Sequence, residues 1–300
     1  MSDEAHSLLE RLKHKARTKS VNVQLLLQLF CQEEFLRRLQ SSLYVNRFIL
    51  KGGFYLYALS EYSTRPTKDI DFLIRQLSNE QEMIRDVILE IIGDQTNQIV
   101  HFKIGKIELI TERREYEGIR IQMIAHIKNT RTPFDIDLGI DDVIVPGPKL
   151  KKIHTQLDGF ESPEVYVYSL ESTIAEKWDA ILERMQQTSR MKDFYDIYDL
   201  SLRFSFDGLK LQEAISQTLQ KRGRNFDSST MGRIHRFGQD PIMNRNWNLF
   251  MKTLRVQLNF ASIMARIIEF IQPPFEAIVF EVELFKQWDP EQGIYINYIH

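Results

Sequence analysis

The spacing of apolar residues predicts two helices at the start of the chain. Leucines and an alanine recur at helical intervals in the first segment, which indicates a helix over residues 4–17. The next apolar stretch predicts a second helix that begins at a cap formed by Ser20 or Asn22 and ends near Leu39. Both helices are amphipathic, so each is expected to cover a core.

Short strands and two further helices follow, and a pair of glycines lies between the first strand and the first of these helices. The run RFILKGG predicts a buried strand that ends at Gly52 and Gly53, FYLYALSEY a helix, and DIDFLI a second strand. Ser78 is expected to open a helix over 79–92, with Gln81 completing a capping box. The alternating pattern beyond it suits a mixed or antiparallel sheet. Its strands are expected over 100–110, 119–127 and 133–140.

The pattern becomes helical after the segment VPGPKLKKI, where proline and glycine punctuate the chain. We therefore predict an α/β (α+β) protein with two domains. The first, over 1–150, holds the mixed sheet and the N-terminal helices, and the second, over 151–300, is α-helical. The helices of the second domain are expected near 169–186, 190–203, 207–221, 244–257, 259–271 and 275–285.

Composition restricts the class of protein but does not indicate a particular ligand. The 300 residues are 43% hydrophobic and 27% charged, with a net charge of −2, so any nucleic-acid footprint has to be local. The single cysteine, Cys31, excludes a disulfide framework or a cysteine zinc site, and its apolar setting favours a core thiol over a nucleophile. No secretory core and no apolar run of membrane length is present, so we expect a cytoplasmic protein without a membrane partner.

Two D-x-D pairs lie inside runs that otherwise resemble buried strands. Because strand side chains alternate, Asp69 and Asp71 share one face of their strand, and Asp135 and Asp137 share one face of theirs. Carboxylates that face the same way on neighbouring strands repel one another unless a cation compensates. Mg²⁺ binds through carboxylates, waters and substrate phosphates, so we predict a magnesium site. The alternative is the solvated face of an antiparallel sheet. A calcium loop is excluded by the positions of Gly and Glu.

Two other features are compatible with phosphate binding. Gly52 and Gly53 follow a strand and open a helix, where bare backbone N–H groups suit a phosphate, although a tight turn would also require glycine. The spacing of a Walker A loop is absent. In the segment 171–200, Lys177 and Arg184 lie on one helical face, and a lysine there can reach a triphosphate. The alternative for this charged face is simple solvation.

The order of these motifs resembles the AbiEii/AbiGii toxin family, relatives of the mycobacterial MenT toxins in the DNA polymerase β-like nucleotidyltransferase superfamily. The matching elements are LKGGFYL, RPTKDIDF, FDIDLG and AEKWDAILER…RMKDFYDIYDL, and the resemblance covers residues 48–260. It implies a bilobed fold with an N-terminal nucleotidyltransferase lobe and a C-terminal helical lobe. The second glycine, Gly53, stands where many polymerase β-like enzymes have serine, so one hydroxyl contact to phosphate is lost.

The resemblance also implies roles for single residues. It implies metal binding by Asp69 and Asp71, with two Mg²⁺ ions and Mn²⁺ as the alternative ion. Asp135 corresponds to the third metal-binding carboxylate and base, and Asp137 remains the other choice. The catalytic set is Asp69, Asp71, Asp135, Lys177 and Asp193. The nucleotide-binding set is Gly52, Gly53, Lys177, Arg184 and Lys192. Arg65, Thr67 and Asp196 also match the family pattern.

Activity and partners follow from the resemblance as expectations. We expect a toxin of a bacterial toxin–antitoxin or phage-defence system that transfers NMP from an NTP to the 3′ end of tRNA. The cognate antitoxin need not contact it directly. An RNA acceptor should leave a basic footprint, and a weaker second candidate for it is RLKHKARTK near the N-terminus. The first candidate set is Lys221, Arg222, Arg224, Arg233 and Arg236. The alternatives are NMP transfer to a protein and an inactive nucleotide- or partner-binding module.

Overall fold

The computed structural model describes residues 2–113, 116–140 and 142–298, and the chain divides into two compact units. The first unit comprises Met1–Asp142 and Pro148–Tyr168, and the second comprises Val143–Gly147 and Ser169–His300. The sequence placed the boundary at residue 150. The observed boundary lies further along because two unpredicted strands, β6 (Lys149–Lys152) and β7 (Glu164–Val167), join the sheet of the first unit.

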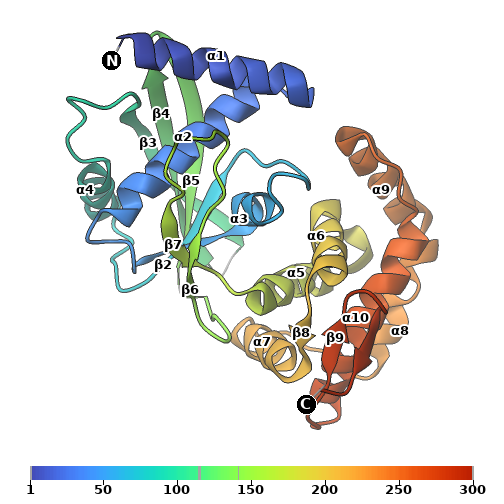
Figure 1. Ribbon diagram of the computed structural model, residues 1–300. Coiled ribbons are helices and arrows are strands. Elements are labelled where there is room, and N and C mark those ends of the chain that lie inside the picture. Colours follow the sequence, from blue (N-terminus) through green and yellow to red (C-terminus); the bar gives the residue numbers. More distant parts are fainter. Residues whose placement is uncertain (1, 114–115, 141, 299–300) are drawn as a thin grey trace. The chain divides into compact units, whose positions relative to one another are not determined.

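The first unit is a mixed sheet with helices (Figure 1). Its strands run in the order β3-β4-β5-β2-β1-β7-β6, with β2 parallel to β5 and β1 parallel to β7 and the other neighbours antiparallel. This confirms the predicted α/β class. The helices are α1 (Ser2–Lys19), α2 (Val23–Gln40), α3 (Gly52–Leu59) and α4 (Gln81–Ile92). The remaining strands are β1 (Phe48–Lys51), β2 (Ile70–Ile74), β3 (His101–Arg113), β4 (Tyr116–Ile127) and β5 (Thr130–Ile140).

Helix α2 covers the apolar face of the sheet. Asn22 caps it by accepting a hydrogen bond from the Gln24 N–H at 2.7 Å, which selects Asn22 over Ser20 as the cap. Phe35 of α2 packs on Phe72 of β2 and Phe102 of β3, with ring centroids 6.1 and 6.3 Å apart. Cys31 lies in the same core and is fully buried, as predicted for a structural thiol.

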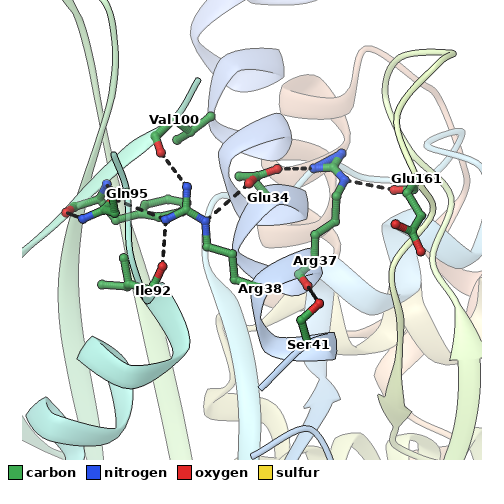
Figure 2. A network of polar contacts seen from close by, with 9 residues as sticks. Glu34, Arg37, Arg38, Ser41, Ile92, Gln95, Val100 and Glu161 are labelled. Atoms are coloured by element: carbon green, nitrogen blue, oxygen red, sulfur yellow. Dashed lines mark hydrogen bonds and ion pairs between the residues drawn. The ribbon is translucent and has the colours of Figure 1, made fainter. Parts of the chain in front are cut away.

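Two arginines of α2 fasten its C-terminal part to its neighbours (Figure 2). The Arg38 guanidinium donates to the Ile92 carbonyl at the end of α4, to the Gln95 amide oxygen and to the Val100 carbonyl before β3. Arg37 donates to the Glu161 carbonyl at 2.9 Å, and Glu34 accepts from both arginines. Each arginine thus satisfies carbonyl groups of connecting segments that no sheet ladder reaches.

The second unit is largely helical, as the sequence predicted. Its helices are α5 (Leu170–Arg184), η1 (Met185–Gln187), α6 (Met191–Arg203), α7 (Gly208–Lys221), α8 (Ser229–Ile234), η2 (Phe237–Gln239), α9 (Pro241–Leu254) and α10 (Phe260–Val279). A small antiparallel sheet adds β8 (Phe206–Asp207), β9 (Gln287–Asp289) and β10 (Ile294–Ile296) in the order β10-β9-β8. Among the described residues, no helix is both long and apolar enough to cross a membrane.

Local signals misled the sequence analysis at two helices. Ser78 does not cap α4; its hydroxyl accepts from the Glu80 N–H at 3.2 Å and closes the turn before the helix, so Gln81 completes no capping box. The helix expected over 259–271 is present, but the break after it and the separate helix over 275–285 are wrong, because α10 continues through Pro273 and Pro274 and ends at Val279. Phe275 explains the continuity, since its ring packs on Trp178 and Phe226 at 5.9 and 5.3 Å between centroids.

A buried carboxylate holds α5 to the end of α7. Asp179 is 0% exposed, and its two oxygens accept from Arg224 Nε at 2.5 Å and Arg222 Nη1 at 2.7 Å. Burial raises the pKa of Asp179, but the hydrogen bonds from Arg224 and Arg222 outweigh it and leave the pKa below its usual value. The flanking Glu183 and Glu176 add ion pairs to Arg224 and Arg222 at 3.0 and 3.8 Å.

We predict that Asp179→Asn lowers the free energy of unfolding of the second unit by about 3 kcal/mol, because it leaves two arginines against an uncharged partner in the interior. Since the folded-state pKa of Asp179 lies below that of the unfolded chain, this contribution is complete at neutral pH and is lost as the pH falls below about 4. Tryptophan fluorescence in urea measures it, because Trp178, Trp247 and Trp288 all lie in this unit.

The exposed carboxylate Glu213 of α7 supplies the control, and Glu213→Gln should leave the urea midpoint unchanged. The difference between the Asp179→Asn and wild-type midpoints should narrow progressively as the pH falls below about 4. Equal midpoints at pH 7 would contradict a stabilising role for the ion pair.

Candidate functional site

The parallel register of β2 and β5 brings the two D-x-D pairs together. Asp71 and Asp137 are direct Cα partners, and so are Ile70 and Ile136 on the opposite face. The isoleucines are fully buried, whereas both aspartates are half-buried, so the carboxylates lie on the face turned away from the apolar core. Asp69 comes directly before β2, and its charge acts on Asp135. The predicted gathering of carboxylates on neighbouring strands is thus present.

The glycine pair lies against these carboxylates. Gly52 has φ +71°, and a Cβ atom built on it would stand 2.2 Å from Asp71 Oδ2. A Cβ on Gly53 would lie 3.0 Å from Thr67 Oγ1 and 3.6 Å from Arg65 Nη1. Gly52 is therefore needed for the close approach of Asp71, and the R-x-T segment that precedes β2 packs on Gly53. The helix α3 starts at Gly52, and its N-cap residue Lys51 makes no side-chain capping bond.

Arg120 of β4 compensates part of the negative charge, and the sequence analysis missed it. Its Nε and Nη2 donate to the two oxygens of Asp137 at 2.7 and 2.6 Å, while Nε lies 4.0 Å from Asp135 Oδ2. This bidentate pair occupies Asp137 and favours Asp135 as the third carboxylate. The signal in the sequence was the polar position of Arg120 in the alternating run IRIQM.

The surroundings of Asp135 disfavour the ionised form of its carboxyl group. Burial raises the pKa of Asp135 above its usual value, Arg120 opposes the rise, and the charges of Asp69 and Asp137 add to it. In turn, the hydrogen bond with Asp137 raises the pKa of Arg120, which stays charged. A cation or a proton at Asp135 would relieve the remaining repulsion.

Lys51 is a second cation of this region that the sequence analysis did not single out. It is the Cα partner of Asp71 across β1 and β2, and its ammonium lies 3.0 Å from Asp142 Oδ2. The same ammonium stands 4.9 Å from the centroid of the Tyr168 ring. Its signal was the position directly before Gly52 in LKGG.

Carboxylate oxygens are the kind of ligand that a hard divalent cation prefers, but the carboxylates here do not surround a single point. Among residues 2–113, 116–140 and 142–298, no group of three or more His, Cys, Asp or Glu side chains is arranged to hold a metal ion. Mg²⁺, however, commonly uses one or two carboxylates and takes its other ligands from water and substrate phosphates. Repulsion between Asp69 and Asp135 is the feature that such an ion would remove. The residues therefore fit Mg²⁺ as a partner that arrives with a phosphorylated substrate.

The predicted lysine cluster forms within the second unit. Lys177 of α5 has a 12% exposed side chain, and its ammonium lies 2.5 Å from Asp196 Oδ2 and 3.5 Å from Asp193 Oδ1. Arg190 pairs with the other oxygen of Asp193 at 2.7 Å. The resemblance places Asp193 in the catalytic set, but Asp196 makes the closer contact with the ammonium of Lys177. Both aspartates are buried, so two fixed anions position the lysine.

The other predicted residues of this segment have different settings. Arg184 closes α5 and is half-buried, and Lys192 is exposed at the start of α6. The structure thus groups Lys177 with Asp193 and Asp196.

The predicted RNA-binding residues do not form a single group. Arg222 and Arg224 form ion pairs with the buried Asp179, so their charges are engaged inside the second unit. Lys221, Arg233 and Arg236 are exposed. In the first unit, Arg11 and Lys15 of RLKHKARTK donate to the carbonyls of Asp158 and Gln156, so they attach α1 to the segment before β7. The basic sequences chosen by composition therefore include several structural cations.

Comparison with known proteins gives a family match over most of the chain. The family described as nucleotidyl transferase AbiEii toxin, of a type IV toxin–antitoxin system, matches residues 34–279. The crystal structure of JHP933 from Helicobacter pylori is 13% identical with a TM-score of 0.48, over 86% of this chain and 97% of that one. Another H. pylori structure, of a candidate nucleotidyltransferase, is 14% identical with a TM-score of 0.45, over 93% and 99%. No curated protein sequence matches the chain.

The matched range includes the glycine pair, both D-x-D strands and the Lys177 cluster. These are the elements that carried the resemblance in the sequence. The chain therefore belongs to the AbiEii family of nucleotidyltransferase toxins.

Proposed function

We propose that this protein is a metal-dependent enzyme that transfers NMP from an NTP to a hydroxyl at the 3′ end of tRNA in the bacterial cytoplasm. The observation that carries the proposal is the convergence of Gly52, Asp71 and Asp135 on one face of the sheet. Nucleotidyl transfer needs a backbone cradle for phosphate beside carboxylates that can hold a divalent cation, and this face offers both.

The proposed reaction assigns a task to each group. The backbone N–H groups at Gly52 and Gly53 bind the triphosphate. Asp69, Asp71 and Asp135 are the groups that would hold Mg²⁺, which supplies charge neutralisation and alignment of the reacting oxygens when bound. Asp135 accepts the proton of the acceptor hydroxyl. The hydroxyl oxygen bonds to the α-phosphorus, the bond to the β-phosphate oxygen breaks, and pyrophosphate leaves.

Family membership also leads us to propose an antitoxin that opposes this activity in a toxin–antitoxin or phage-defence system. The type IV description of the family is compatible with an antitoxin that never contacts the chain. Transfer to a Ser, Thr or Tyr of a protein is the second candidate function, because the same carboxylate site would activate any hydroxyl.

We predict that Asp69→Asn and Asp71→Asn abolish transfer from α-³²P NTPs in the presence of Mg²⁺ and total bacterial RNA, because each removes a metal-binding charge. Asp86→Asn, at an exposed position of α4, is the control and should retain full activity. Circular dichroism checks that all three variants fold. Label of tRNA size that is lost to RNase supports the proposal, and label lost only to protease moves the acceptor to protein. Undiminished transfer by the folded Asp69→Asn, Asp71→Asn double variant would sink the assignment.

We predict that Gly52→Ala lowers kcat by about a hundredfold, because the added methyl group would displace the Asp71 carboxylate by about an ångström. Gly159→Ala is the matched control. Gly159 also has a positive φ, +82°, but no atom lies within 4 Å of an added Cβ, so it reports backbone strain alone. Steady-state label transfer measures both variants. Equal activities of the two would show that Gly52 does not have to admit Asp71.

We predict that Arg120→Gln moves the acid limb of the kcat/KM profile to higher pH, because Arg120 lowers the pKa of Asp135. Asp135 acts as a base only when ionised, so the loss of activity should be larger at pH 6 than at pH 8. The double variant Arg120→Gln, Asp137→Asn also removes one repelling charge, and its acid limb should lie between those of the single variant and the wild type. An unchanged profile in the single variant would argue against Asp135 as the base.

A further inference from the structure

The carboxylates lie at one end of a longer polar face that belongs to β3, β4 and β5. Strand register arranges its side chains in cross-strand rows, which continue away from Asp137 toward the turn between β4 and β5. In order, the rows are Glu108 with Arg120 and Asp137; Gln122 with Asp135; Lys103 with Ile124 and Pro133; and His101 with His126 and Arg131.

This face is open to solvent, whereas the reverse face of the same strands is buried. His101, Lys103, Gln122, Arg131 and Pro133 are exposed. The alternate residues of β4 and β5 are buried, and α2 and α4 pack on that side of the sheet (Figure 1). Because α2 and α4 pack on the buried face, they leave the polar face of these strands accessible to a ligand.

The sign of the charge reverses along the face. Acidic side chains gather at the Asp135 end, while the other end carries Lys103, Arg131 and Lys128 of the turn, which we call the distal basic end. Between them lie the neutral Gln122, Ile124 and Pro133. In β5 the step from Asp135 to Arg131 is about 13 Å at roughly 3.3 Å per residue. At about 3.4 Å per stacked nucleotide, that distance corresponds to about four nucleotides.

We propose that this face binds the 3′-terminal single-stranded segment of an RNA acceptor. Its terminal hydroxyl points to Asp135, and the phosphates about four nucleotides upstream contact the distal basic end. The proposal rests on the proposed nucleotidyl transfer and adds the surface and the direction of the strand.

Charge complementarity selects this occupant. The 3′-terminal residue of RNA ends in a hydroxyl without a further phosphate, so it is the part of the polyanion that an acidic cluster repels least. The upstream phosphates need cations, and Lys103, Arg131 and Lys128 supply them beyond the neutral rows. The rings of His101 and His126, with Ile124 between the basic and acidic ends, offer stacking surfaces to unpaired bases.

The test compares two double variants that remove equal charge from the same sheet. Lys103→Gln, Arg131→Gln changes the distal basic end, and Lys149→Gln, Lys151→Gln changes exposed lysines of β6 at the opposite edge. The probe is a fluorescein-labelled, unstructured RNA 12-mer with a free 3′ hydroxyl, and anisotropy is recorded across a salt series. The same RNA, and a 3-mer, serve as acceptors in label transfer.

We expect the Lys103→Gln, Arg131→Gln variant to bind the 12-mer on the order of tenfold more weakly at 0.1 M salt. The slope of log K against log salt should fall by about 1.4, for two lost phosphate contacts. The β6 variant should bind like the wild type, and the 3-mer should be extended equally by all three proteins because it is too short to reach the distal basic end. A 12-mer that carries a 3′ phosphate should bind more weakly than the free hydroxyl form.

The outcomes separate this inference from the proposed function. If the wild type extends the 12-mer but the two double variants bind it alike, the surface is wrong and nucleotidyl transfer stands. If the wild type extends no RNA, nucleotidyl transfer to RNA fails, while the anisotropy series still decides whether the surface binds RNA. An RNA duplex whose binding depends equally on Lys103 and Arg131 would overturn the assignment to a single strand.

Discussion

The parallel pairing of β2 with β5, in a register that sets Asp71 beside Asp137, is the constraint on which the first unit depends. It collects like charges on one face of a sheet whose reverse face is a packed apolar core. Coulomb repulsion at this spacing has to be compensated by nearby cations. Arg120 compensates Asp137, whereas Asp135 keeps a raised pKa. The raised pKa of Asp135 marks the point where chemistry on a phosphorylated substrate would need a cation.

The same rule, that a buried carboxylate requires a cationic partner, acts twice in the second unit with different results. Asp179 is enclosed by Arg222 and Arg224 at the join of α5 and α7, and both guanidiniums serve packing. Asp193 and Asp196 instead hold the ammonium of Lys177 at the margin of α5, where the side chain keeps some exposure. In the sequence alone, these aspartates, arginines and lysine are simply charged residues, and nothing marks which of them form pairs. Burial of the anion and the identity of its partner separate the structural pair from the candidate functional one.

Glycine and strand geometry set the dimensions of the proposed chemistry. The conformation of Gly52 lets the backbone approach Asp71, so the start of α3 and the carboxylates share one small region. From there the open face of β3, β4 and β5 continues for several residues before it becomes basic. A small phosphorylated ligand and an extended polyanion would therefore make different demands on the same sheet, one at the acidic end and the other along its length.

The sequence by itself determined the local periodicities and the order of the motifs. Alternation in DIDFLI and FDIDLGI was enough to put Asp69 and Asp71, and Asp135 and Asp137, on common faces, and the motif order identified the AbiEii family. Only the tertiary structure decided which carboxylate Arg120 neutralises, which arginines belong to Asp179, and that β6 and β7 complete the first sheet. The face on which a side chain lies follows from the backbone repeat of its own segment. The residue that it contacts depends on strand register and on packing between segments that are distant in the chain, and these cannot be read from local periodicity.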